Sequence, residues 1–164
     1  MNTLANILVV DDSANDVFLL EQAFKKAAAT SRLYSVQDGI DARAYLKGEG
    51  VFSDRAVHPF PDLLLLDLNM PRMNGFEFLQ WLRTDDDCSQ LVIYVLSASA
   101  RDADVHRAYR LGANSYVVKP SRMDELVSFV AAMHQWHRFT VLPSQPALRS
   151  ALSAQSFTRS PAAT

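Results

Sequence analysis

The chain has 164 residues, of which 49% are hydrophobic and 21% charged, and 16 Lys and Arg nearly balance 18 Asp and Glu. This length and apolar content fit one domain with a sizeable core. The net charge of −2 argues against a general nucleic-acid binder, because neutralising phosphates requires an excess of Lys and Arg on one face. The single cysteine, Cys88, excludes an intramolecular disulfide and favours a cytoplasmic location.

The first apolar run, Ile7–Val10, is short and has no Lys or Arg before it. A secretory signal peptide needs a basic start and a longer apolar run, and a membrane span needs about 20 apolar residues. We therefore expect neither a signal peptide nor a membrane partner.

Five apolar runs of strand length alternate with helical patterns. In chain order the runs are Ile7–Val10, a weaker Leu33–Val36, Leu63–Leu66, Leu91–Leu96 and Tyr116–Val118. Continuous apolar runs are typical of strands buried on both faces of a parallel sheet. The repeated order of strand and helix predicts an α/β fold, an open parallel sheet with helices on both faces.

A helical pattern follows each run. The predicted helices contain, in order, Val17, Leu20, Phe24 and Ala27; Ile40–Leu46; Phe76, Leu79 and Leu82; Asp102–Arg110; and Leu126, Phe129, Val130 and Met133. Ser13 and Asp16 have the spacing of a reciprocal cap at the start of the first helix. Asn74-Gly75 is interpreted as a turn and nothing more.

Residues 138–164 differ in composition from the rest of the chain. They contain three Arg and no Asp or Glu, whereas residues 1–137 carry 13 basic and 18 acidic residues, a net charge of 13 − 18 = −5. We therefore expect a domain over 1–137 and a C-terminal extension over 138–164. The extension is predicted to be irregular, although Leu148, Leu152 and Phe157 would suit a short amphipathic helix that packs on the domain or on a partner.

Polar residues follow four of the predicted strands. Asp11 and Asp12 come after the first strand, Asp67 after the third, Ser97 after the fourth and Lys119 after the fifth. The carboxyl ends of parallel strands share one edge, where ligands bind. Clustered carboxylates repel one another unless a cation lies among them, and oxygen ligands without His or Cys favour Mg²⁺. With a lysine and a hydroxyl, the cluster suits phosphoryl transfer onto a carboxylate, for which Asp67 is best placed.

At these residues the sequence resembles the CheY-like receiver domain of two-component response regulators. The resemblance covers about residues 4–137 and rests on Ile7–Ser13, Leu65–Pro71 with Gly75, Val95–Ala98 and Ser115–Pro120. It implies a flavodoxin-like, doubly wound fold of five strands and five helices, with strand order 2-1-3-4-5.

The resemblance also implies a role for each acidic residue of the site. Asp67 matches the aspartate that accepts a phosphoryl group from the phosphohistidine of a sensor histidine kinase. Asp12 and Asp67 match the side-chain ligands of Mg²⁺, Asn69 matches the residue whose main-chain carbonyl completes that site, and Asp11 matches a supporting acid.

The same comparison implies how phosphorylation is sensed. Ser97 and Lys119 match the hydroxyl and the lysine that bind the phosphoryl group, and Tyr116 matches the aromatic switch residue. The Lys119–Pro120 bond is typically cis in this family. The implied output is protein binding through a surface at about Asp102–His137, which also suits a homodimer, with the extension as a second dimer contact.

Less specific features resemble the stand-alone receivers that partner bacterial phytochrome histidine kinases. They are the long loop Glu49–Pro61, the sequence Leu96–Ser99, and Trp136 followed by Thr140–Ser144. Only about 27 residues follow the last predicted helix, which is too short for an effector domain.

Two other functions compete with this interpretation. A Mg²⁺-dependent phosphohydrolase with an aspartate nucleophile would carry a second acid two residues after Asp67, but Asn69 stands there. We therefore expect a phosphoacceptor, not an enzyme that turns over external substrates. A receiver-like module that binds partners without phosphorylation would not need the full acidic set. Outside the site, Trp136 is predicted to cover the core, and His134 and His137 to bind no metal.

Overall fold

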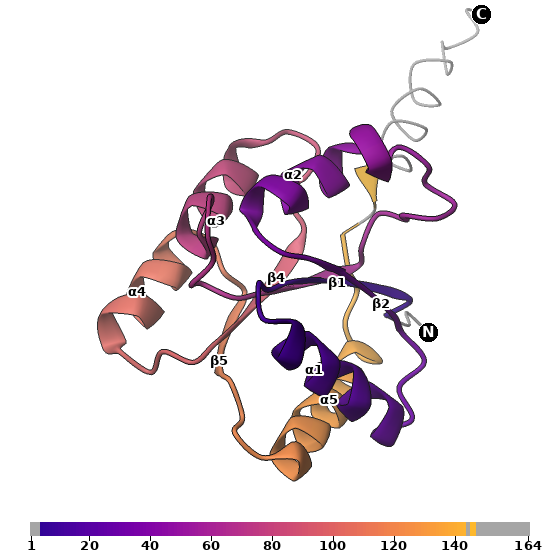
Figure 1. Cartoon of the computed structure of the whole chain (residues 1–164), viewed down its shortest axis with the longest axis vertical. Helices are drawn as coiled ribbons and strands as arrows, with labels where there is room; N and C mark the ends of the chain where they lie inside the picture. The colour runs from indigo at the N-terminus through magenta and orange to yellow at the C-terminus, as the bar shows by residue number, and fades with distance from the viewer. Residues whose placement is uncertain (1–3, 144, 147–164) are drawn as a thin grey trace, which may run out of the picture.

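The structure is a computed structural model that describes residues 4–143, 145 and 146. Five parallel strands form one sheet in the order β2-β1-β3-β4-β5, as predicted (Figure 1). The strands are β1 (Asn6–Val10), β2 (Arg32–Val36), β3 (Leu63–Leu66), β4 (Val92–Ser97) and β5 (Ser115–Val118). The helices are α1 (Ala14–Lys26), α2 (Gly39–Lys47), α3 (Gly75–Thr84), α4 (Asp102–Arg110) and α5 (Met123–His137), with a short 3₁₀ turn at Gly50–Phe52.

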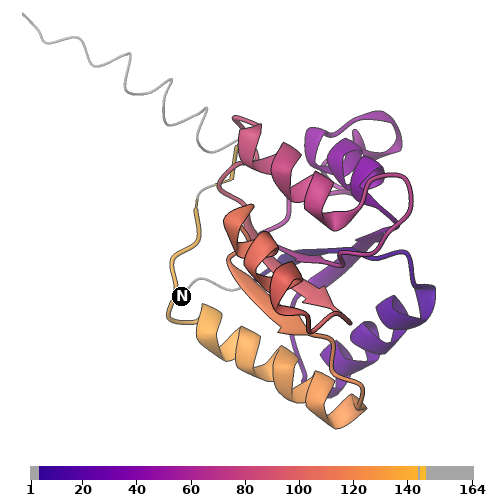
Figure 2. The ribbon, with the colours of Figure 1, turned by 90° about the vertical axis from the view of Figure 1, so that its left-hand side faces the viewer.

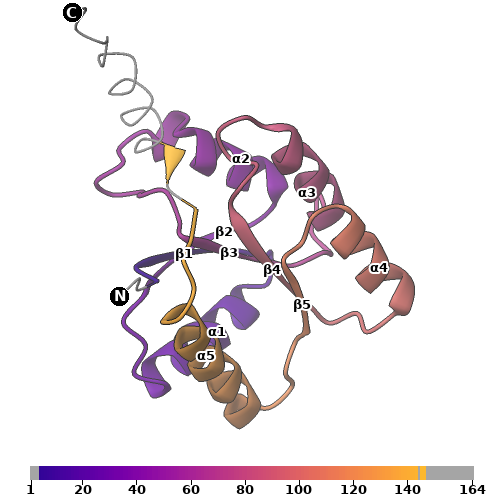
Figure 3. The same cartoon turned by 180° about the vertical axis from the view of Figure 1, so that it is seen from behind.

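Helices cover both faces of the sheet (Figures 2 and 3). α1 and α5 pack together on one face, and α2, α3 and α4 cover the other. Successive strand residues point to opposite faces, so each strand supplies both layers. The α2–α4 layer takes Leu8, Val10, Leu64, Leu66, Ile93 and Val95, and the α1–α5 layer takes Ile7, Val9, Leu63 and Leu65. This two-sided burial explains why the strands read as continuous apolar runs.

The end of α5 differs from the prediction for one residue. Trp136 is 61% exposed and does not cover the core, so that expectation is wrong. The helix instead turns Leu126, Val130 and Met133 toward the sheet. Trp136 lies three residues after Met133, but the buried position in the last turn is taken by His137.

Both histidines of α5 have structural partners. The His137 ring lies within hydrogen-bonding distance of the Tyr94 hydroxyl (3.1 Å) and the Thr140 hydroxyl (3.0 Å). The His134 ring packs edge-on against Phe24. Among the described residues, neither histidine belongs to a group that could hold a metal.

Burial of His137 makes stability depend on pH. Burial, and secondarily repulsion from His134, lowers the pKa of His137 below its ordinary 6.5. The unfolded chain therefore takes up a proton before the folded one does, and the free energy of unfolding should fall as pH drops below about 6.5. Urea denaturation at pH 7.5 and 5.5 measures this fall. The fall in the free energy of unfolding should be smaller in His137→Gln than in the wild type. It should be unchanged in the control His106→Gln, which replaces an exposed histidine of α4.

Residues 138–143 lead away from α5 toward the loop before β3 (Figure 3). Leu142 packs against the α1–α5 layer, and the Gln145 side-chain amide donates to Asp62 (3.0 Å) and to the carbonyl of Phe60 (3.3 Å). The predicted amphipathic positions Leu148, Leu152 and Phe157 lie outside the described residues. No helix in the described part of the chain is long and apolar enough to cross a membrane.

Candidate functional site

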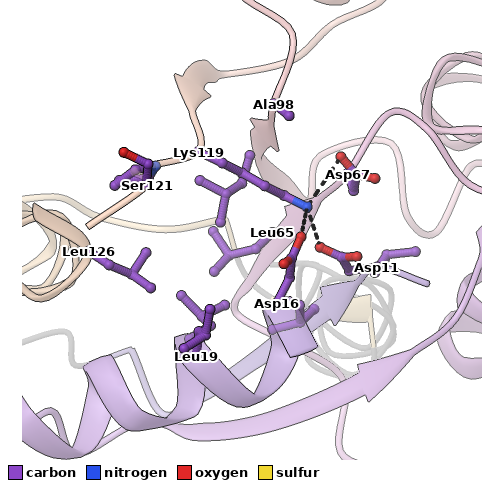
Figure 4. Close-up of a pocket in the computed structure, with 14 residues that line it drawn as sticks. Asp11, Asp16, Leu19, Leu65, Asp67, Ala98, Lys119, Ser121 and Leu126 are labelled. Carbon is purple, nitrogen blue, oxygen red and sulfur yellow. Dashed lines mark hydrogen bonds and ion pairs between the residues drawn. The ribbon is translucent and has the colours of Figure 1, made fainter. Parts of the chain in front are cut away.

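The residues at the site come from the carboxyl ends of three strands. Backbone hydrogen bonds continue the ladder one residue past each strand: Asp11 N–H donates to Val36, Asp67 N–H to Val10 and Lys119 N–H to Ser97, over 2.8 to 3.0 Å. The sheet therefore fixes the backbones of Asp11, Asp67 and Lys119, and their side chains converge at one edge (Figure 4).

Three carboxylates form a cluster with the chemistry of a divalent cation site. Asp11, Asp12 and Asp67 each offer an oxygen, and these atoms lie within 4.8 Å of one another. Asp11 and Asp67 are buried, whereas Asp12 is exposed. Oxygen ligands alone, with one side open to solvent, suit Mg²⁺ or Mn²⁺, which keep several waters. The sequence prediction that these acids lie together is confirmed.

Lys119 is the cation that faces this cluster. Its Nζ lies 2.7 Å from Asp11, 2.7 Å from Asp16 and 3.6 Å from Asp67 (Figure 4). Burial alone would lower the pKa of Lys119, but hydrogen bonds to Asp11 and Asp16 outweigh it and raise the pKa above the usual value. The ammonium is therefore a permanent charge at the site.

Asp67 is held in an unfavourable environment for a carboxylate. Burial raises its pKa, and nearby Asp11 adds to the effect, whereas Lys119 opposes it. Backbone hydrogen bonds at Leu68 and Asn69 also favour the ionised form, but the net shift is upward. A second positive charge beside Asp67 would relieve this cost.

Ser97 and Tyr116 lie on the neighbouring strands. Ser97 is fully buried, and its hydroxyl accepts a hydrogen bond from Ser99 N–H (3.3 Å). The Tyr116 hydroxyl donates to the carbonyl of Ser99 (2.9 Å). Both side chains therefore contact the loop between β4 and α4.

The expectation of a cis bond at Lys119–Pro120 is wrong, since the described residues contain no cis peptide. This agrees with the general trans preference of X–Pro bonds.

Asn74 and Gly75 do more than form a turn, so the predicted interpretation was incomplete. The Asn74 side chain caps α3 in a reciprocal capping box with Glu77. A Cβ at Gly75 would collide with the carbonyl oxygen of Asp67 and lie 2.8 Å from Leu68 Cα. Glycine thus lets α3 begin directly against the backbone of Asp67.

The predicted cap of α1 is only half formed. Ser13 accepts a hydrogen bond from Asp16 N–H (3.2 Å), but Ser13 N–H donates to Asp11 (2.9 Å) instead of to Asp16. The Asp16 carboxylate reaches Lys119 instead. Its place in the site was missed, because a Ser-x-x-Asp spacing before a helix is also what a cap requires.

A pocket of about 300 Å³ opens beside these charges, between α1 and α5 (Figure 4). Its apolar wall includes Leu19, Leu65 and Leu126, and Asp16 and Lys119 stand on its polar side. Asp11 and Asp67 also line this pocket, so these two carboxylates are reached from this side of the sheet edge.

The five-stranded parallel sheet brings three carboxylates and a lysine together at its carboxyl edge, where α/β domains of this kind bind their ligands. Residues 7–131 match the response regulator receiver domain. The chain therefore belongs to the response regulator receiver family.

Relatives and solved structures agree with this assignment. Response regulator Rcp1 of Synechocystis is 31% identical over 139 residues, which cover 84% of this chain and 92% of Rcp1. The structure of RPA3017, described as a response regulator in red light signaling of R. palustris, has a TM-score of 0.82 at 34% identity and covers 87% of this chain and all of that one. The phosphorylated cyanobacterial phytochrome response regulator RcpA has a TM-score of 0.76 at 30% identity, with 85% and 99% covered. The Mn²⁺-bound form of Rcp1 has a TM-score of 0.74 at 30% identity, with the same coverage.

Proposed function

We propose that this chain is a single-domain response regulator of a two-component phosphorelay that accepts a phosphoryl group on Asp67. The observation that carries the proposal is the position of the buried Asp67 carboxylate, 3.6 Å from Lys119 Nζ and clustered with Asp11 and Asp12. In this proposal residues 1–137 form the receiver and 138–164 an extension.

The transfer is a substitution at phosphorus. An Asp67 oxygen attacks the phosphorus of a kinase phosphohistidine, the P–O bond forms as the P–N bond breaks, and the imidazole leaves with the electron pair. Lys119 balances charge on the phosphoryl oxygens. The Asp12 and Asp67 side chains and the Asn69 main-chain carbonyl would hold Mg²⁺, with Asp11 as a supporting acid. When bound, Mg²⁺ would neutralise phosphoryl oxygens and bring donor and acceptor together.

We assign Ser97 and Tyr116 to the switch that follows phosphorylation. Both contact the β4–α4 loop at Ser99, so a shift of the Ser97 hydroxyl toward a phosphoryl group would change that loop and the position of Tyr116. The change would reach the surface formed by Asp102–His137, which we propose as the protein-binding or homodimer face. Similarity to RPA3017, a response regulator in red light signaling, and to the phytochrome response regulator RcpA supports a phytochrome-type histidine kinase as the phosphate donor.

Transfer of labelled phosphate from such a kinase, with and without Mg²⁺, tests the proposal. One stable, Mg²⁺-dependent acyl phosphate per chain supports it. Multiple turnovers of generic phosphate esters would instead favour the aspartate-nucleophile phosphohydrolase, and partner binding without any labelling would favour the phosphorylation-independent module.

Magnesium should stabilise the folded protein, because it relieves repulsion among carboxylates that are close together only in the fold. A ligand at 100 times its dissociation constant stabilises by about 2.7 kcal/mol, and thermal denaturation with and without Mg²⁺ measures the gain. Asp12→Asn should lose most of it. The control Asp102→Asn, an exposed acid in the first turn of α4, should keep it, and an equal loss in both variants would contradict the assignment.

A further inference from the structure

Asp16 occupies a place in the site that the proposed phosphotransfer does not use. It lies in the first turn of α1 and is outside the group of carboxylates able to hold a metal. Its carboxylate nevertheless lies as close to Lys119 Nζ as that of Asp11, at 2.7 Å.

The three ion pairs of Lys119 are unequal. Asp11 and Asp16 accept hydrogen bonds from Nζ, whereas the 3.6 Å separation from Asp67 is too long for one. In Figure 4, Asp16 and Asp67 approach the ammonium from different sides. In the resting structure the Lys119 ammonium is therefore hydrogen-bonded to Asp11 and Asp16, and it makes only a longer ionic contact with Asp67.

We propose that Asp16 is a positioning residue that holds Lys119 off Asp67 in the unphosphorylated protein. The inference rests on the proposed function. A phosphoryl group on Asp67 competes with Asp16 for the ammonium, so Lys119 exchanges one anion for the other as the site becomes phosphorylated. Asp16 thereby sets how strongly the resting state is favoured over the phosphorylated state.

The exchange has a predictable direction. Replacing Asp16 by Asn removes a charge-assisted hydrogen bond that Lys119 makes only in the resting state. When only one of two states makes a hydrogen bond between charged groups, losing that bond shifts the affinity by about tenfold. Asp16→Asn should therefore bind a phosphoryl mimic about tenfold more tightly.

Beryllofluoride, which binds aspartate as a mimic of the acyl phosphate, tests this at equilibrium. Its affinity is measured by ¹⁹F NMR titration in the presence of Mg²⁺. The matched control is Asp41→Asn, because Asp41 lies in the first turn of α2, is 37% exposed against 38% for Asp16, and also pairs with a cation, Arg72. Tighter binding in Asp16→Asn with unchanged binding in Asp41→Asn supports the proposal, and unchanged or weaker binding in Asp16→Asn overturns it.

A double-mutant cycle with Lys119→Ala separates positioning from direct repulsion. If Asp16 acts through Lys119, Asp16→Asn should alter affinity less than about twofold in the Lys119→Ala background. A full tenfold gain there would overturn the proposal, because Asp16 would then repel the probe directly. Asp16→Ser provides a second variant if Asp16→Asn folds poorly. If the wild-type chain takes neither phosphate nor beryllofluoride, the proposed function fails and this inference with it; if it takes both and Asp16→Asn binds no tighter, only this inference fails.

Discussion

The Asp67→Asn variant should accept no phosphate from a histidine kinase, with labelling reduced by about 100-fold or more. An amide cannot attack phosphorus as a carboxylate does, and no other carboxylate follows β3 at the strand edge. The side chain keeps its shape, and Lys119 keeps its two short contacts with Asp11 and Asp16. Labelling retained at another residue would refute the assignment of Asp67.

The same variant should be at least as stable as the wild type at neutral pH without Mg²⁺. The pKa of Asp67 is raised, mainly by burial, so the folded state binds its proton more tightly than the unfolded state. The wild-type free energy of unfolding therefore falls as pH rises through that pKa, and Asp67→Asn should lack this fall. Urea denaturation at pH 3.5 and 7 measures the difference. A variant that unfolds at neutral pH would show that Asp67 is structural.

Much of the fold could be predicted from the sequence, because two-sided burial leaves a simple pattern. Leu63–Leu66 is entirely buried in β3, and a run of four leucines next to an aspartate has few other interpretations. The edge strand β2, from Arg32 to Val36, is only partly buried, which is why its pattern is weaker. The convergence of Asp11, Asp67 and Lys119 follows from parallel topology, since residues after each strand must meet at one edge.

Contacts that depend on packing were harder to predict. The turn interpretation of Asn74-Gly75 did not include the close approach of α3 to Asp67, because the distance between two backbones is not encoded locally. Helical periodicity predicts which face of a helix is buried but not which residues bound that face. We therefore predicted that Trp136 would cover the core, whereas His137 takes the buried position. Asp16 satisfied a local capping pattern, and only the tertiary structure brings it to Lys119.

The Lys119→Ala variant should lose phosphorylation and switching while it remains folded. Without the ammonium, Asp11, Asp16 and Asp67 face one another with no internal cation, so incoming phosphate meets uncompensated negative charge. Removing one preorganised electrostatic group costs about 100- to 1000-fold in rate, and we expect a loss of that order in labelling from the kinase. Mg²⁺ should bind the variant more tightly than the wild type, because the site is more negative, and should offset part of its lost stability.

The matched control is Lys47→Ala, which removes a lysine that also bridges two aspartates, Asp85 at 2.8 Å and Asp87 at 3.3 Å, far from the strand edge. Wild-type labelling in Lys119→Ala, or an equal loss in both variants, would show that Lys119 serves the fold and not the phosphoryl group.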